Sequence, residues 1–210
     1  MGSDIHGVFQ AKKDEKWVDI PHKFRKNRHY ILFAWLGNVR NGYGFAGVKT
    51  HSPLTPLSDQ RGFPTDFELT GEYNKEHPTT LECLNEWDRK WAENYPEEPL
   101  VKWMGDHSHS WVSAKEILET TPPVVFCQGV VERKLFDKWD GISKPDNFYG
   151  DVYGPNVVVN DRDSITDVTT HVIISWPCDL AEEVGYFIDE VKRLVSEHGE
   201  NVRFVFGFDS

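Results

Sequence analysis

The chain of 210 residues has few cysteines and no long apolar run. Cys83, Cys127 and Cys178 are widely spaced and form no CxxC pair, so we expect neither a disulfide framework nor a cysteine zinc site, and we predict reduced thiols. No segment approaches the roughly 20 apolar residues of a membrane-spanning helix, and the first ten residues lack the basic and then apolar order of a signal peptide. The sequence therefore predicts a cytoplasmic protein without a membrane partner.

Basic residues are also scarce, because 23 lysines and arginines face 34 aspartates and glutamates, which gives a net charge of -11. Binding to a phosphate backbone requires a basic surplus, so this balance argues against non-specific nucleic-acid binding, although residues 23–29 form a local basic stretch. The hydrophobic share of 39%, with 8 Trp and 13 Phe, is enough to bury a core. We expect a single globular domain over residues 1–210.

Periodicity predicts an α+β fold with a small mixed or antiparallel sheet, several helices and long irregular loops. Short β-prone runs at 5–11 and 17–20 indicate an opening hairpin. Capping and stop signals predict four helices: one within 28–40 that Asn27 caps, one from Thr79 to before Pro96, one from Ser113 to before Pro122, and one from Asp179 to Gly199. Strands are expected at 171–176 and 202–209, and loops over most of 41–78 and 140–170.

Two short polar runs have residue types and spacing that suit metal binding. Asp4 and His6 lie two apart in an expected strand, so both side chains would project from one face; the alternative is a strand that begins with solvent-facing residues. Asp106, His107 and His109 lie in the run GDHSHSW, and an extended chain would again place both imidazoles on one side. The alternative there is a polar loop whose histidines bond the backbone.

Other candidates lie at strand and helix ends. Asp209 follows an apolar strand, where its carboxylate could reach a shared site or fray with the terminus. Arg28 and Arg61 could clamp a phosphate, although such arginines usually form surface ion pairs. Trp103 and Trp111 flank the histidines and could stack a ring, or could belong to the core.

The run Ser3-Asp4-Ile5-His6-Gly7 resembles the DxHG motif of calcineurin-like metallophosphoesterases. The GDxxD and GNH blocks of that family are absent, and residues 105–109 match its paired histidines only loosely. The resemblance therefore implies a similar ligand chemistry and not the same fold.

A broader resemblance is to a family of small bacteriophage and bacterial proteins. It rests on DIHG at residues 4–7, an RxYxLFxxLxxVR pattern at 28–40, RGxPxD at 61–66, GDHSHSW at 105–111 and VRxVFxFD at 202–209, and it is weak over 67–102. It implies a viral origin, hence the cytoplasm of an infected bacterium, and a site assembled from these separated blocks. It implies no particular activity.

The leading hypothesis is a phage-type, metal-dependent hydrolase that acts on a phosphodiester or nucleotide-like small molecule. A divalent ion, Zn, Mn or Mg, would supply the attacking water, and an arginine would steady the developing charge. The expected metal ligands are Asp4, His6, His107, His109 and Asp209; the expected catalytic residues are Asp106, His107 and His109; the expected binding residues are Arg28, Arg61 and Trp111.

Two alternatives remain. One is a non-catalytic counter-defence protein that binds a host signalling nucleotide or another host defence component, such as an enzyme, with arginines and tryptophans lining the pocket. The other, ranked lowest, is an acidic mimic of DNA, suggested only by the net charge.

Overall fold

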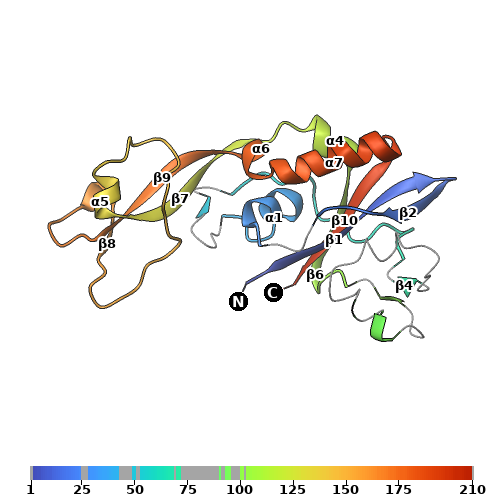
Figure 1. Ribbon diagram of the computed structural model, residues 1–210, viewed down its shortest axis with the longest axis horizontal. Coiled ribbons are helices and arrows are strands. Elements are labelled where there is room, and N and C mark those ends of the chain that lie inside the picture. The colour runs from blue at the N-terminus through green and yellow to red at the C-terminus, as the bar shows by residue number, and fades with distance from the viewer. Residues whose placement is uncertain are drawn as a thin grey trace. The chain divides into compact units, whose positions relative to one another are not determined.

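The computed structural model describes residues 2–24, 28–42, 49–50, 53–68, 70–71, 90, 93–95, 100–101 and 103–209. The chain divides into two compact units: Met1–His29, Pro56–Thr121 and Tyr186–Ser210 form the first, and Tyr30–Thr55 and Pro122–Gly185 form the second. The predicted α+β fold is confirmed, since each unit has its own sheet beside short helices (Figure 1). The expected single domain stays a prediction. Three predictions fall largely outside the described residues: the cap at Asn27, the reduced thiol of Cys83, and nearly all of the helix expected from Thr79.

The first unit is built on a four-stranded antiparallel sheet. Its strands follow the order β2 (Lys16–Ile20), β1 (Asp4–Lys13), β10 (Val202–Asp209) and β6 (His107–Ser113). The predicted hairpin is confirmed, and its two-residue turn has positive φ angles, 47° at Asp14 and 64° at Glu15, as a turn matched to strand twist requires. A separate two-stranded pair joins β4 (Thr70–Gly71) to β5 (Leu100–Val101).

The two ends of the chain meet in this sheet. β1 and β10 pair antiparallel in a register that sets Asp4 opposite Asp209 and Ala11 opposite Val202. The first residue of β1 and the last residue of β10 therefore lie side by side at the same end of the sheet, as the N and C labels in Figure 1 indicate. This register puts the first and last polar residues of the chain in contact.

Both faces of β10 are buried. Phe204, Phe206 and Phe208 lie on one face, and Phe204 packs against Phe187 of α7 (Gly185–His198) with ring centroids 5.2 Å apart. Full burial of a phenylalanine contributes about 1.5–3 kcal/mol, so this aromatic row is a main source of the unit's stability. On the opposite face Val205 packs with Val8 and Met104 under a cover of partly buried aromatic side chains: Phe63, Phe67 and Trp111.

Two of the predicted helix starts are confirmed in detail. Ser113 and Glu116 form the reciprocal capping box that opens α4 (Ala114–Glu119). The Asp179 carboxylate accepts from the Ala181 amide at the start of α6 (Leu180–Glu183). The prediction of one continuous helix from Asp179 to Gly199 is wrong, because α6 ends at Glu183 and a separate helix, α7, begins at Gly185. The glycine in EEVGYF is a sequence signal for this interruption.

The second unit contains a mixed four-stranded sheet. Its order is β3 (Lys49–Thr50), β7 (Val124–Glu132), β9 (His171–Asp179) and β8 (Val159–Asp161), with β8 parallel to β9. The predicted strand at 171–176 is confirmed as part of β9. The unit also holds α1 (Tyr30–Gly37), which confirms the helix expected within 28–40 and is buried along its whole length, α5 (Arg133–Phe136) and the 3-10 turn η1 (Arg162–Ser164).

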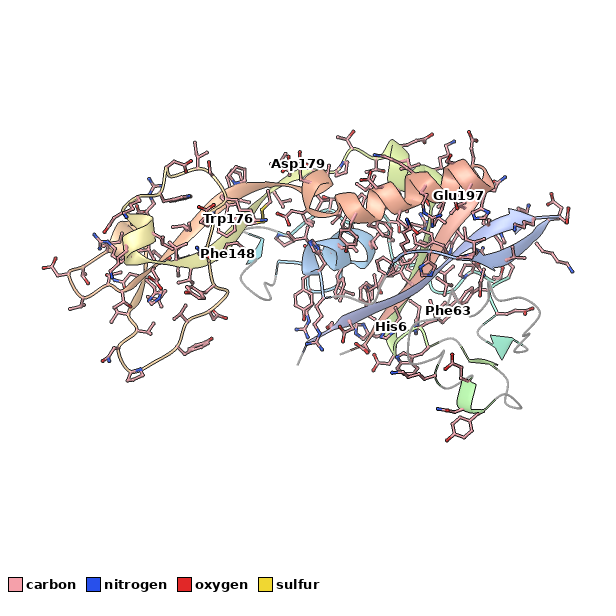
Figure 2. The ribbon with its side chains drawn as sticks, viewed as in Figure 1. His6, Phe63, Phe148, Trp176, Asp179 and Glu197 are labelled. Carbon is pink, nitrogen blue, oxygen red and sulfur yellow. A yellow bond between two sulfur atoms is a disulfide. The ribbon has the colours of Figure 1, made fainter. Side chains whose placement is uncertain are left out.

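The prediction of reduced thiols is wrong for two of the three cysteines. Cys127 of β7 and Cys178 of β9 form a disulfide with their Cα atoms 6.0 Å apart. The register places Cys127 opposite Trp176, so the sulfur atoms bridge the strands diagonally beside the Trp176 ring, which packs on Phe148 (Figure 2). Residues 51 apart in sequence meet only because β7 pairs with β9, and cysteine spacing carries no information on that pairing.

A helix that crosses a bilayer must be both long and apolar, and the helices in the described parts of the chain are short or amphipathic. None of them combines the length and the apolar character needed to cross a membrane.

Candidate functional site

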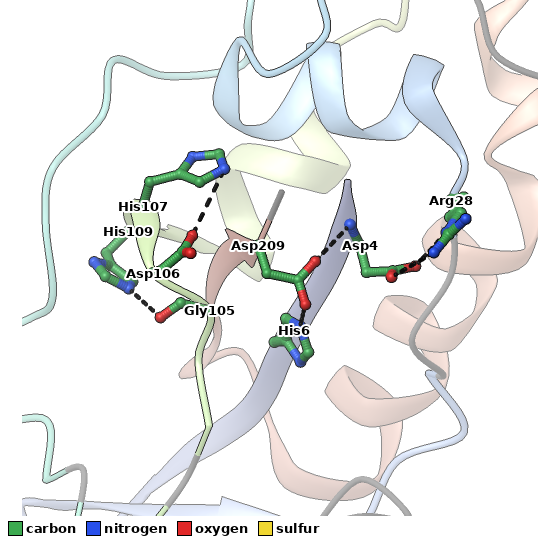
Figure 3. Close-up of polar contacts among 8 residues, drawn as sticks. All are labelled: Asp4, His6, Arg28, Gly105, Asp106, His107, His109 and Asp209. Atoms are coloured by element: carbon green, nitrogen blue, oxygen red, sulfur yellow. Dashed lines mark hydrogen bonds and ion pairs between the residues drawn. The ribbon is translucent and has the colours of Figure 1, made fainter. Parts of the chain in front are cut away.

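Four polar side chains meet where β1 begins and β10 ends. His6 Nε2 lies 3.0 Å from Asp209 Oδ2, and the Asp4 amide donates to Asp209 Oδ1 at 3.0 Å. Arg28 donates to both oxygens of Asp4, at 2.9 and 3.2 Å (Figure 3). The His6 side chain is only 4% exposed and Asp209 is 27% exposed, so the cluster lies at the protein surface with its imidazole inside. We call these four residues the terminal cluster.

The terminal cluster places two carboxylates beside one guanidinium and one imidazole. Asp4 and Asp209 are direct cross-strand partners, a position where like charges repel. Arg28 neutralises one of the two carboxylates, and its guanidinium is always charged. The other carboxylate, that of Asp209, contacts the buried His6 imidazole.

His109 of β6 lies on the same face of the sheet as His6 of β1, and β10 runs between the two strands. Gly207 is the register partner of His6, and a Cβ atom on Gly207 would collide with the His109 ring and with the Met104 carbonyl oxygen. His109 Nε2 lies 3.1 Å from the Gly105 carbonyl oxygen and must donate to it, and its ring packs under Phe63 at 4.3 Å. The histidine is therefore held in place from two sides.

The expectation that His107 and His109 face the same way is wrong. His107 pairs with Phe208 and Ser110 pairs with Phe206, so three steps along β6 span two steps along β10. The extra residue is accommodated by a bulge in which Ser108 has a φ of 51°. The bulge turns the His107 ring onto the Phe208 side of the sheet, where the two rings stack at 6.2 Å, away from His6.

Asp106 and His107 contact each other more loosely than a shared proton would require. His107 Nε2 is 4.0 Å from the Asp106 carboxylate (Figure 3). Its Nδ1 is 2.9 Å from the Ser108 hydroxyl. The Asp106 amide donates to the Phe208 carbonyl, which ties this segment to the end of β10. The two residues thus lie beside the end of β10, next to Asp209.

Arg61 and Trp111, both expected to bind a ligand, contact each other. The Arg61 guanidinium lies 4.9 Å from the Trp111 ring centroid and donates to both oxygens of Glu116. The hydrogen bond from Arg61, together with those from Ser113, lowers the pKa of Glu116 to about 2. The Gly62 amide donates to the His109 carbonyl, so the segment 61–67 lies along β6 as a strap. In this arrangement Arg61 and Trp111 hold the strap and the start of α4.

Sequence reasoning did not identify the buried arginine of β10. Arg203 is 3% exposed, donates to Gln10, pairs with Asp66 of the strap at 2.8 Å and lies 4.2 Å from the Trp17 ring centroid. Burial lowers the pKa of Arg203, and the Asp66 carboxylate opposes that effect. An arginine within the otherwise apolar run VRFVFGF was the available signal. These contacts fix the strap at its other end.

Within the described residues no group of three or more His, Cys, Asp or Glu is already arranged to hold a metal ion. Cavities of about 410 and 210 Å³ lie in the second unit, the first between α5 and residues 138–147 and the second between β7, β8 and residues 150–153; no predicted site residue lines either of them.

No family model, curated protein or solved structure matches this chain. Both resemblances noted in the sequence stay predictions.

Proposed function

We propose that this chain is a metal-dependent hydrolase of phosphodiesters or nucleotide-like small molecules, and that Asp4, His6 and Asp209 hold the metal ion. The observation that supports this proposal is the contact of two carboxylates and one imidazole from opposite ends of the sequence. Such donors suit Zn²⁺, Mn²⁺ or Mg²⁺. The two carboxylates of the terminal cluster favour a divalent cation over an anion at this position.

In the proposed reaction, different residues bind the metal ion, orient its ligands and bind the substrate. A bound divalent ion lowers the pKa of its water and so supplies a nucleophile near neutral pH. Asp4, His6 and Asp209 would hold the ion, and the contact between Asp209 Oδ2 and His6 Nε2 would orient the imidazole. With the ion on Asp4 in place of Arg28, the planar guanidinium would be available for two phosphate oxygens of the substrate. His109 supports this face through Gly207.

The exchange at Asp4 makes a specific prediction about Arg28. Because its guanidinium competes with the ion for the Asp4 oxygens, Arg28→Gln should bind Mn²⁺ more tightly than the wild type in calorimetric titration. Because the same residue steadies the substrate phosphate, Arg28→Gln should also lower turnover. An unchanged metal affinity in this variant contradicts the assignment of Asp4 as a ligand.

The principal experiment measures metal content and hydrolysis in one series. Protein purified without a chelator or a histidine tag is analysed by mass spectrometry for bound metal and assayed on bis(4-nitrophenyl) phosphate. His6→Ala and Asp209→Asn should lose metal and activity together. His198→Ala, a matched histidine at the end of α7, should retain both. Equal metal content in all of these proteins would falsify the proposal.

A non-catalytic binder is the second candidate, and one observation favours it. Within the terminal cluster the Asp4 carboxylate already contacts Arg28, and the Asp209 carboxylate already contacts His6. A protein of this kind would bind a host signalling nucleotide without turnover, with or without Mn²⁺. Stoichiometric nucleotide binding with intact nucleotide recovered after prolonged incubation would favour this candidate over the hydrolase.

A further inference from the structure

Trp103 is a half-exposed aromatic ring that touches the terminal cluster. Its side chain is 49% exposed, and its ring meets the buried His6 ring edge to face, with centroids 6.2 Å apart and planes at 82°. Single exposed tryptophans are common on protein surfaces. This one differs because its neighbour is the imidazole that bonds Asp209.

The backbone next to Trp103 is fixed to the sheet. Met104 is 3% exposed and packs with Val8 and Val205. Gly105 has a φ of 77°, and a Cβ atom there would collide with the backbone of Phe208, so only glycine allows so close an approach. The Trp103 ring therefore extends from an anchored segment, which limits the entropy lost when a ligand covers it.

Trp111 and Trp17 lack this combination of exposure and position. Trp111 is covered by the Arg61 guanidinium and packs on the core of Val8, Met104 and Val205, and Trp17 lies over buried Arg203. Of these three rings, Trp103 is the one that presents half of its surface beside the terminal cluster.

We propose that Trp103 is the stacking platform for a nucleobase, so that the ligand of the terminal cluster is a nucleotide and not a simple phosphate ester. This inference deepens the proposed function and rests on it for the identity of the site. Every base has a π-face that can stack on an aromatic side chain. Replacing such a ring by alanine lowers the binding affinity by roughly 5- to 150-fold. Purines, with the larger ring area, should bind more tightly than pyrimidines.

The test compares ligands with and without a base. Calorimetric titrations with AMP, GMP, CMP, UMP and ribose 5-phosphate, each with and without Mn²⁺, are run on the wild type and on Trp103→Ala. We expect the variant to bind AMP roughly 5- to 150-fold more weakly and to bind ribose 5-phosphate as the wild type does. Trp103→Phe should restore most of the AMP affinity. Tyr153→Ala, which removes an aromatic ring that is 85% exposed in the second unit, should change neither affinity.

Three results would overturn the inference: no binding of any of the four nucleotides, equal AMP affinity in the wild type and Trp103→Ala, or an equal loss for AMP and ribose 5-phosphate. The last result would assign Trp103 to packing on His6. Failure of the hydrolase is seen separately, because a protein that binds AMP through Trp103 but neither holds metal nor cleaves bis(4-nitrophenyl) phosphate retains the platform and loses the proposed reaction.

Discussion

Replacing Gly207 by alanine tests the packing that places His109 beside the strand of Asp209. A Cβ atom at this position would lie too close to both the Met104 carbonyl oxygen and the His109 ring, and the carbonyl belongs to the backbone and cannot rotate away. Overpacking of this kind costs about 1–3 kcal/mol. For a protein of this length each kcal/mol corresponds to about 2–4 °C in Tm, so Gly207→Ala should melt about 2–12 °C below the wild type.

The matched control is Gly185→Ala at the start of α7, where an added Cβ atom meets nothing within 4 Å. There alanine restricts the unfolded chain and should leave Tm unchanged or raise it slightly. A double-mutant cycle with His109→Ala separates the two collisions, because removal of the ring should recover part of the loss and give a coupling energy of at least about 0.5 kcal/mol. A Tm within 1 °C of the wild type for Gly207→Ala, or strict additivity in the cycle, would refute this packing.

Two further predictions concern the ends of the strap and the second unit. The folded-state pKa of Glu116 lies near 2, below its ordinary value of 4.5, so the stability that this carboxylate contributes is fully present above pH 4.5 and is lost as the pH falls towards 2. Urea titrations from pH 6 to pH 2 should therefore show a smaller loss of stability with acid in Arg61→Gln than in the wild type. The disulfide closes a loop of 51 residues, which corresponds to about 4 kcal/mol of chain entropy. Cys127→Ser should therefore lower the urea midpoint of the second unit, measured by hydrogen exchange of the amides in β7 and β9. Dithiothreitol should lower the midpoint of the wild type and leave that of the variant unchanged.

Features that depend on neighbouring residues were predictable from the sequence. The capping box of Ser113 and Glu116 lies within four residues, and the buried stripe of α7, with Phe187, Val191 and Leu194, follows helical spacing. The opening hairpin is equally local. In each case the signal and the structure that it predicts occupy the same short segment.

Features that depend on strand pairing were not predictable in this way. The facing of His107 and His109 is set by a bulge at Ser108, and that bulge is defined only against β10. The disulfide requires the pairing of β7 with β9. The sequence suggested that residues near both ends of the chain could share a site. The register of β1 with β10 does bring Asp4 and Asp209 together. The register of β6 with β10 places His107 on the opposite face of the sheet.

The engagement of Arg61 is a third example of a tertiary effect. Its planar guanidinium suggested either a phosphate clamp or a surface ion pair, and in the structure Glu116 and Trp111 occupy it. Nothing within the segment RGFPTDF specifies those partners, which come from residues 50 and 55 positions further along the chain.

Paramagnetic broadening by Mn²⁺ tests most directly whether the two ends of the chain form one cation site. In a ¹H–¹⁵N spectrum with less than one equivalent of Mn²⁺, the amide signals of residues 4–6 and 207–209 should broaden first and together, while those of 171–176 in the second unit stay sharp. In His6→Ala this selective broadening should be lost. Broadening spread evenly over acidic surface residues, or confined to only one end of the chain, would show that no shared site exists.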